Sequence, residues 1–261
     1  MLKAIAFDLW ETLITDTPEN SRRQERLRLD RMERVLVERG FSETAARIES
    51  AYRSFWHRCY ERYWSRDEDI ACRVQIEHFL DELGLGASAF DEPSLAALED
   101  AYARAAVEIP PLPVTGAPEV LASLRERGYL IGLISNTGRT PGYALRDVLD
   151  KLGLGASIDV MLFSNEHGVC KPNPSIFSSL RDTLGCRYDE MMFVGDNIYV
   201  DVHGAQILGM TGVHFDPPTR GTAIAPPVDH GLEIVPHATI TDLRELIEIV
   251  ESHQGSLQAA R

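Results

Sequence analysis

Cysteine is scarce in this chain of 261 residues. The four cysteines form no C-x-x-C pair, and none has a Cys/His spacing typical of a zinc site. They are Cys59, Cys72, Cys170 and Cys186. A disulfide scaffold is therefore excluded, and we expect reduced, buried thiols in a cytoplasmic protein.

Long apolar runs and an excess of positive charge are also missing. No stretch of 18 apolar residues occurs, which excludes a transmembrane helix. The opening MLKAIAFDLW is interrupted by Asp8 and is too short for a signal peptide. With 26 basic against 40 acidic residues, the net charge is -14, so phosphate backbones repel the chain. We expect no nucleic-acid or membrane partner, whereas a small anionic substrate remains compatible with a local basic patch; the oligomeric state stays open.

The spacing of apolar residues follows two different patterns along the chain. An apolar strand at 2–8 is followed, from about 21 to 109, by four amphipathic segments without a strand signal. These predict helices at about 21–40, 42–65 (with Ser42 as N-cap), 69–83 and 94–107. Such a run is typical of a helical module, and the prolines at 110, 111 and 113 mark its end.

After these prolines, short apolar strands alternate with helices. Strands are expected at 129–134, 158–163, 191–194, 211–215 and 232–235, and helices at 117–127, 139–152, 174–184, 200–208 and 242–251. Alternation of this kind predicts an α/β fold, a doubly wound parallel sheet with a Rossmann-like core. We predict an α/β core at 1–16 and 110–252, an inserted all-helical cap at 17–109, and a flexible tail at 253–261.

Reactive side chains follow several of the expected strands. In open parallel sheets, ligands bind at the carboxyl ends of the strands, so these residues should meet at one edge. They are Asp8 and Thr12, Ser135 and Asn136, Lys171, and Asp196 and Asp201. Clustered carboxylates repel one another, which implies a cation, and oxygen ligands suit Mg²⁺. A lysine and a hydroxyl beside them suit a phosphoryl group or similar oxyanion.

The motifs resemble those of the haloacid dehalogenase-like hydrolase superfamily. They are FDLWETL at 7–13, ISN at 134–136, KPNPSIF at 171–177 and VGDNIYVD at 194–201. Four ordered motifs in the expected strand context make the resemblance specific. The helical insertion matches the position of that family's cap domain, between the first and second motifs.

The resemblance implies roles for individual residues. Asp8 would be the nucleophile that forms an aspartyl intermediate, Ser135 the hydroxyl that binds the transferring group, and Lys171 the lysine that orients Asp8. Magnesium would be held by Asp8, the backbone carbonyl of Trp10, Asp196 and, through water, Asp201. Substrate-binding candidates beside these residues are Thr12, Asn136, Thr137 and Arg139.

The sequence departs from the pattern of the family's phosphatases at one important position. Those enzymes carry a second aspartate two residues after the nucleophile, which acts as general acid and base, whereas this chain has Trp10. The following position, usually glycine, is Glu11. An indole has no proton to give near neutral pH. Because general acid–base catalysis typically contributes ~10²–10⁴-fold, hydrolysis of plain monoesters should suffer.

Three interpretations remain open. We favour a magnesium-dependent phosphatase that prefers good leaving groups or is aided by Glu11. A 2-haloacid dehalogenase is the second, because halide leaves without a proton and family dehalogenases carry an aromatic residue at this place. Those enzymes, however, need no Mg²⁺ and typically lack the acidic residue retained here as Asp196. The third is a non-catalytic binding protein on a degenerate site, against which the intact Asp8 and Lys171 argue.

Of all parts of the sequence, the cap segment indicates least about function. Its second predicted helix is rich in aromatic residues, most of which we expect in the core of the helical module: Tyr52, Phe55, Trp56, Tyr60, Tyr63 and Trp64. One or two could instead roof the site. Two connections to the core, near 16–20 and 110–113, would allow the cap to close like a hinge.

Overall fold

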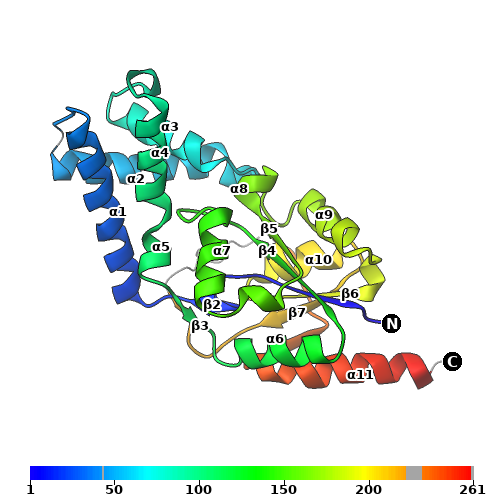
Figure 1. Ribbon diagram of the computed structural model, residues 1–261. Coiled ribbons are helices and arrows are strands. Elements are labelled where there is room, and N and C mark those ends of the chain that lie inside the picture. Colours follow the sequence, from blue (N-terminus) through cyan, green and yellow to red (C-terminus); the bar gives the residue numbers. More distant parts are fainter. Residues whose placement is uncertain (43, 222–230, 260–261) are drawn as a thin grey trace.

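The core is a six-stranded parallel sheet with the strand order β5-β4-β1-β6-β7-β8, which confirms the predicted α/β fold. A computed structural model describes residues 1–42, 44–221 and 231–259 of the chain (Figure 1). The strands are β1 (Ala4–Phe7), β4 (Leu130–Ser135), β5 (Val160–Phe163), β6 (Met191–Gly195), β7 (Thr211–Phe215) and β8 (Ala238–Ile240). All residues of β1 are buried, as expected for a central strand covered on both faces.

Helices cover both faces of this sheet. One face packs against α6 (Ala117–Glu126), α7 (Gly142–Lys151) and α11 (Leu246–Ala259), in a cluster that includes Ile5, Phe7 and Leu133. The other face packs against α9 (Pro174–Leu184) and α10 (Gly204–Gln206). Short helical turns complete the core: α8 (Ser164–His167), η3 (Gly155–Ser157), η4 (Tyr188–Glu190) and η6 (Leu243–Glu245).

The inserted segment folds as a helical cap with its own apolar core. It contains α1 (Pro18–Glu38), α2 (Ala45–Arg62), η1 (Trp64–Arg66), α3 (Cys72–Glu82), η2 (Ala87–Ala89), α4 (Glu92–Ala103) and α5 (Ala105–Glu108). The longer helices α1, α2 and α4 begin at side-chain caps, with Thr17, Thr44 and Asp91 accepting hydrogen bonds from the first turn. In Figure 1 the cap lies at the end of the sheet opposite the two chain termini.

The two connections between cap and core form a small antiparallel ribbon. Strand β2 (Ile14–Thr15) pairs with β3 (Leu112–Pro113). The amide of Gln24 donates to Asp16 Oδ2 and to the carbonyl of Ile109, both at 2.8 Å. The amide of Asn20 donates to the carbonyl of Pro110 at 2.9 Å. The first turns of α1 therefore tie the two connections together.

Several element boundaries differ from the sequence predictions. Helix α2 is capped by Thr44 instead of Ser42, and α7 starts at Gly142 because Pro141 favours an extended residue before it. The stretch at 232–235 is not a strand: Leu232 and Val235 are exposed, and the edge strand is β8. The last helix runs to Ala259 rather than ending at 251; residues 260–261 of the predicted tail lie outside the described residues.

Two further predictions can be compared with the structure. In the part of the chain that the structure describes, no helix combines the length and apolarity needed to cross a bilayer. All four cysteines are buried free thiols, as the sequence indicated.

Candidate active site

Three reactive residues lie at the carboxyl ends of three adjacent strands. Asp8 follows β1, Ser135 ends β4, and Asp196 follows β6, and the sheet order places β1 between the other two. Asp8 and Ser135 are buried, and Asp196 is partly exposed. This edge of the sheet faces the cap in Figure 1, so the fold brings the predicted residues to one place.

Lys171 lies at the centre of this group, fully buried. Its Nζ lies 2.6 Å from Asp8 Oδ1 and 2.8 Å from Asp201 Oδ1, and it donates to the carbonyl of Ile134 at 2.9 Å. Burial alone would lower the pKa of Lys171, but the charges of Asp201 and Asp8 outweigh it and raise that pKa above its ordinary value. The lysine is therefore a permanent cation that holds the Asp8 carboxylate in a fixed orientation.

Asn136 fixes the backbone of this lysine. Its amide nitrogen donates to the carbonyl of Lys171 at 2.9 Å, and its Oδ1 accepts from the Lys171 N–H at 2.7 Å. The side chain of Asn136 is thus engaged with the main chain of Lys171. This pair of bonds couples the loop after β4 to the loop that carries the lysine.

Asp8, Asp196 and Asp201 form an acidic cluster. Each offers a carboxylate oxygen, and these oxygens lie within 4.8 Å of one another. Burial, followed by the charges of Asp8 and Asp201, raises the pKa of Asp196 to about 8. Burial also raises the pKa of Asp201 to about 6, against the lowering effect of Lys171. Mutual repulsion in a set of hard oxygen donors is relieved by a divalent cation, so the residues present fit Mg²⁺.

The backbone after β6 has an unusual form that places Asp201. Residues Ile198–His203 form a π-helical turn, whose N-cap Asn197 accepts from the N–H groups of Tyr199 and Val200. Asp201 Oδ2 in turn accepts from the Asn197 N–H at 3.0 Å. A Cβ at Gly195 would lie 2.3 Å from that same oxygen, so only glycine fits beside the carboxylate. The sequence indicated an ordinary helix at 200–208, but π turns are frequent at functional sites.

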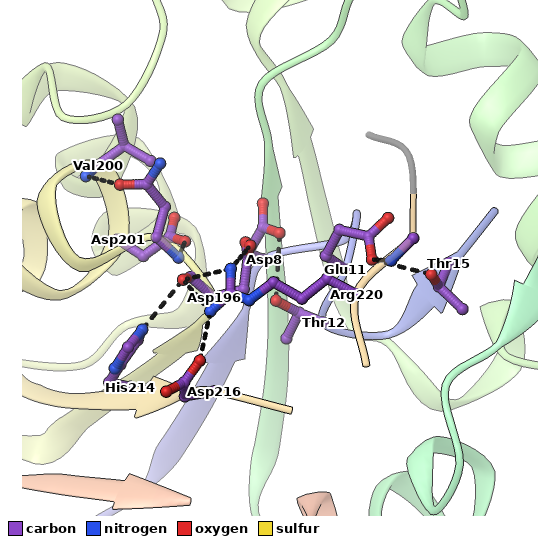
Figure 2. A network of polar contacts seen from close by, with 12 residues as sticks. Asp8, Glu11, Thr12, Thr15, Asp196, Val200, Asp201, His214, Asp216 and Arg220 are labelled. Carbon is purple, nitrogen blue, oxygen red and sulfur yellow. Dashed lines mark hydrogen bonds and ion pairs between the residues drawn. The ribbon is translucent and has the colours of Figure 1, made fainter. Parts of the chain in front are cut away.

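Arg220 joins the site from the loop after β7, although no motif of the sequence singles it out. Its guanidinium donates to Asp196 Oδ2 at 2.9 Å and to Asp216 Oδ1 at 2.8 Å. His214 Nε2 lies 3.1 Å from the Asp196 carbonyl oxygen. Figure 2 shows the arginine side chain reaching across to Asp196, beside Asp8. The arginine thus supplies a second positive charge next to the acidic cluster.

The tight turn after Asp8 carries the departure from the family pattern. Thr12 Oγ1 donates to Asp8 Oδ2 at 3.3 Å, and Trp10 is half-buried against the core. Glu11 has a φ of 59°, a left-handed conformation that explains why glycine is usual at this place. Its carboxylate accepts from Thr15 Oγ1 at 2.9 Å and from the N–H of Gly221 at 2.6 Å (Figure 2). The Glu11 side chain therefore ties the turn to the loop that carries Arg220.

The remaining predicted residues lie in the loop after β4. Ser135 is fully buried, and its Oγ lies 3.5 Å from the Asn136 carbonyl. Thr137 Oγ1 donates to the cap residue Asp69 at 3.0 Å and lies 3.2 Å from Ser164 Oγ. Arg139 stacks on a cap aromatic, with its guanidinium carbon 3.9 Å from the Trp56 ring centroid. Asp69 and Ser164 belong to no motif, so the sequence did not single them out.

A family model supports the assignment suggested by the motifs. The model for a haloacid dehalogenase-like hydrolase matches residues 2–209. That span includes every residue of the acidic cluster, Lys171 and the complete cap. Arg220 lies beyond it.

Several curated relatives of moderate similarity are named as phosphatases. The chain is 31% identical over 145 residues to the glyceraldehyde 3-phosphate phosphatase of Pyrococcus furiosus, an alignment of 55% of this chain and 56% of that protein. It is 28% identical over 265 residues to the phosphoserine phosphatase of Thermus thermophilus, covering 94% of this chain and 98% of that one. The chain thus spans about half the length of the first relative and nearly all of the second.

Solved structures share the whole architecture. The crystal structure of a 2-haloacid dehalogenase from Pseudomonas syringae pv. Tomato superposes with a TM-score of 0.66 over 97% of this chain and 99% of that chain. Sequence identity between the two is 18%. At this level the match reports the fold alone and does not distinguish one hydrolase chemistry from another.

Proposed function

The chain belongs to the haloacid dehalogenase-like hydrolase family and is an enzyme, and we propose that it is a Mg²⁺-dependent phosphatase of small phosphorylated metabolites with Asp8 as nucleophile. One observation carries the proposal: Lys171 bridges Asp8 and Asp201 beside Asp196, so a charged, oriented carboxylate lies next to a set of magnesium donors. The phosphatase names of the relatives agree with it. The acidic chain with buried free thiols suits a cytoplasmic enzyme.

The metal would be held by Asp8, the Trp10 backbone carbonyl and Asp196, with Asp201 acting through water. When bound, Mg²⁺ neutralises charge on the phosphoryl oxygens and lets an anionic substrate approach an anionic nucleophile. All other roles in the reaction belong to side chains of the protein itself. We assign Arg220 to the same acidic cluster, as a cation that balances Asp196.

In the first half-reaction, a carboxylate oxygen of Asp8 attacks phosphorus and the bond from phosphorus to the leaving oxygen breaks. Lys171 orients Asp8 through its ion pair, and the Ser135 hydroxyl donates to an equatorial phosphoryl oxygen. In the second half-reaction, water attacks phosphorus, the bond between phosphorus and the Asp8 oxygen breaks, and both protons of that water leave with the inorganic phosphate as H₂PO₄⁻. The nucleophile is thereby regenerated.

The leaving group receives no proton from position 10. Trp10 cannot supply one, and the Glu11 carboxylate is occupied by Thr15 and Gly221. We therefore assign the enzyme to substrates whose leaving oxygen is stable as an anion or takes its proton from solvent. Acyl and aryl phosphates fit this description better than alkyl phosphates.

The four predicted substrate-binding residues receive more specific roles. Asn136 and Thr137 have side chains engaged with Lys171 and with Asp69, so we assign them to positioning. Thr12 holds the second oxygen of Asp8. Arg139, stacked on Trp56 at the border of core and cap, is assigned to an anionic group on the substrate, away from the phosphoryl group.

A substrate panel tests the proposal. Phosphorylated metabolites, acyl and aryl phosphates and 2-haloacids are each assayed with Mg²⁺ and with a chelator. We expect phosphate release only with Mg²⁺. If 2-haloacids are turned over and this activity persists in the chelator, the dehalogenase interpretation replaces the phosphatase. If none of the compounds is turned over, the result favours the non-catalytic interpretation.

Asp8→Asn tests the nucleophile. The amide is a poor nucleophile and cannot form the ion pair with Lys171, so turnover should fall by about 10³-fold or more. Circular dichroism and a melting curve check that the variant is folded. A folded variant that retains activity would rule out the covalent route through Asp8.

A further inference from the structure

Asp69 is a buried carboxylate of the cap that the proposed reaction does not use. It lies between η1 and α3 and is 6% exposed. Its Oδ1 accepts from Trp64 Nε1 and from the Ile70 N–H, each at 2.7 Å. Its Oδ2 accepts from Thr137 Oγ1 at 3.0 Å and from the Ser164 hydroxyl. One carboxylate therefore joins the cap to two core loops, those that follow β4 and β5.

The backbone around Asp69 is joined to the core as well. The Asp69 N–H donates to the carbonyl of Gly168 at 3.0 Å, and the Cys170 N–H donates to the carbonyl of Asp67 at 2.8 Å. Between them, Glu68 and Val169 form an isolated antiparallel bridge. The next residue after Cys170 is Lys171. The cap segment 67–70 thus pairs with the stretch of core that leads directly to the lysine.

A second set of cap contacts holds the loop after β4 from its other side. Trp64 packs on Trp56 with ring centroids 4.4 Å apart, and Trp56 carries the stacked Arg139. A Cβ at Gly138 would lie 2.7 Å from the Trp56 ring, so the loop is seated directly against it. Gln75 of α3 also donates to the Gly138 carbonyl, at 3.3 Å. Residues 137–139 are therefore enclosed by cap side chains.

Burial of a carboxylate at this place calls for an explanation beyond packing. A desolvated carboxylate is costly unless hydrogen bonds compensate it, and an apolar side chain would fill the space without that cost. Here four donors compensate it, two from the cap and two from the core. Such an arrangement fixes geometry, because the donors must keep their places for the carboxylate to remain buried.

We propose that Asp69 is a positioning residue through which the cap sets the loops of Ser135 and Lys171. The two loops are already coupled by Asn136, so the carboxylate fixes both at once. This inference rests on the proposed function in one respect, the assignment of the two loops to catalysis.

Asp69→Asn is the test, with Asp91→Asn as matched control. Asp91 is another cap carboxylate, which caps α4 by accepting from the Ser94 N–H; among the residues that the structure describes, its hydrogen bonds and its ion pair with Arg39 stay within the cap. Amide hydrogen exchange is measured in peptides covering 135–140 and 164–171. For Asp69→Asn we expect exchange there to rise about tenfold, and kcat on the best substrate of the panel to fall about 10–100-fold with KM changed less than about threefold. The control should show none of these changes.

Two results would overturn the proposal. One is unchanged exchange at both segments in Asp69→Asn; the other is an unchanged kcat despite raised exchange. If the parent protein turns over no substrate at all, the proposed function fails, and the exchange measurement alone decides the role of Asp69. If Asp69→Asn does not fold, Trp64→Phe removes one cap donor to the carboxylate and is judged by the same criteria.

Discussion

Trp10 lies half-buried in the turn after β1, where it packs against the apolar cluster of one sheet face. If it stands at the proton-transfer position, Trp10→Asp should speed the hydrolysis of alkyl phosphates, whose alkoxide leaves badly without a proton. The gain is bounded by the ~10²–10⁴-fold range of general acid catalysis, less the cost of replacing a packed indole.

The measurement is the ratio of alkyl to aryl phosphate rates in parent and variant. Aryl phosphates barely need the proton and serve as an internal control. An unchanged ratio would show that position 10 is not the proton-transfer position. If Trp10 instead lines a pocket for a haloacid, the new carboxylate should lower that activity.

Arg220 is the second side chain whose effect can be isolated. Its guanidinium binds Asp196 Oδ2, so a positive charge already lies beside the proposed metal ligands. Arg220→Gln should strengthen Mg²⁺ binding about fivefold or more, because like charges repel strongly at a partly buried site. Isothermal titration of the protein with MgCl₂ measures this without any turnover. Arg187→Gln, at an exposed pair with Asp189, is the control. Weaker binding in Arg220→Gln would instead mean that the arginine orients Asp196.

The acidic cluster and its lysine could be predicted because each follows a strand of a parallel sheet. Ligands bind at the carboxyl ends of parallel strands, and applying this rule requires only the order of the elements along the chain. The rule brings Asp8, Lys171, Asp196 and Asp201 together, as they are in the structure. Arg220 could not be found this way, because its contact depends on the path of the loop after β7. Asp69 was missed for a similar reason: it lies in the cap, and its partners are hydroxyl groups without a motif.

At the scale of elements, long periodic segments were predicted well and short ones poorly. Helix α9 begins and ends as expected, because Asn173 caps it, Pro174 starts it and Gly185 ends it at a φ of 66°. The two-residue strands β2 and β3 have no periodicity to detect, and they exist through pairing across the cap insertion. Apolar residues at 232–235 suggested a strand, but tertiary pairing selected β8 instead.

The ribbon between cap and core should depend on Gln24. Its amide donates to the buried Asp16 and to the Ile109 carbonyl, so Gln24→Ala would remove both bonds and leave the Ile109 carbonyl without this donor. We expect the free energy of unfolding to fall by about 1–3 kcal/mol, measured by urea denaturation. Arg26→Ala removes only an exposed pair with Asp30 on the same helix and should change it by less than about 0.5 kcal/mol. Equal effects of the two variants would contradict the role of Gln24.

For the whole molecule, metal binding and stability should be linked through pH. Without metal, the pKa of Asp196 is about 8 and that of Asp201 about 6, both above the ordinary 3.8. Groups with raised pKa values stabilise the fold at low pH, and this stability is lost as pH rises from about 4 through 6 to 8. Mg²⁺ binds to the deprotonated carboxylates of Asp196 and Asp201, so it takes the place of the protons that these groups bind at low pH. The rise in melting temperature that it causes should be several degrees larger at pH 8 than at pH 5.

Melting curves with Mg²⁺ or with a chelator at each pH provide the measurement. Comparing the two at the same pH cancels the titration of groups away from the site. A metal effect that is equal at pH 5 and pH 8 would show that Mg²⁺ does not bind at the acidic cluster.

The chain has only three tryptophans, and their places give the molecule an optical consequence. Trp10 lies in the turn that follows Asp8, while Trp56 and Trp64 pack against each other at an interplanar angle of 51° where the cap meets the loop after β4. Tryptophan emission of the unlabelled protein therefore arises from the turn beside the acidic cluster and from the contact between cap and core. Replacing Trp10 by phenylalanine would leave a dye-free reporter of the contact between cap and core, and replacing the tryptophan pair would leave a reporter of events beside Asp8, the proposed nucleophile. Stopped-flow fluorescence on the two variants would then time changes beside Asp8 and changes at the contact between cap and core separately within a single turnover.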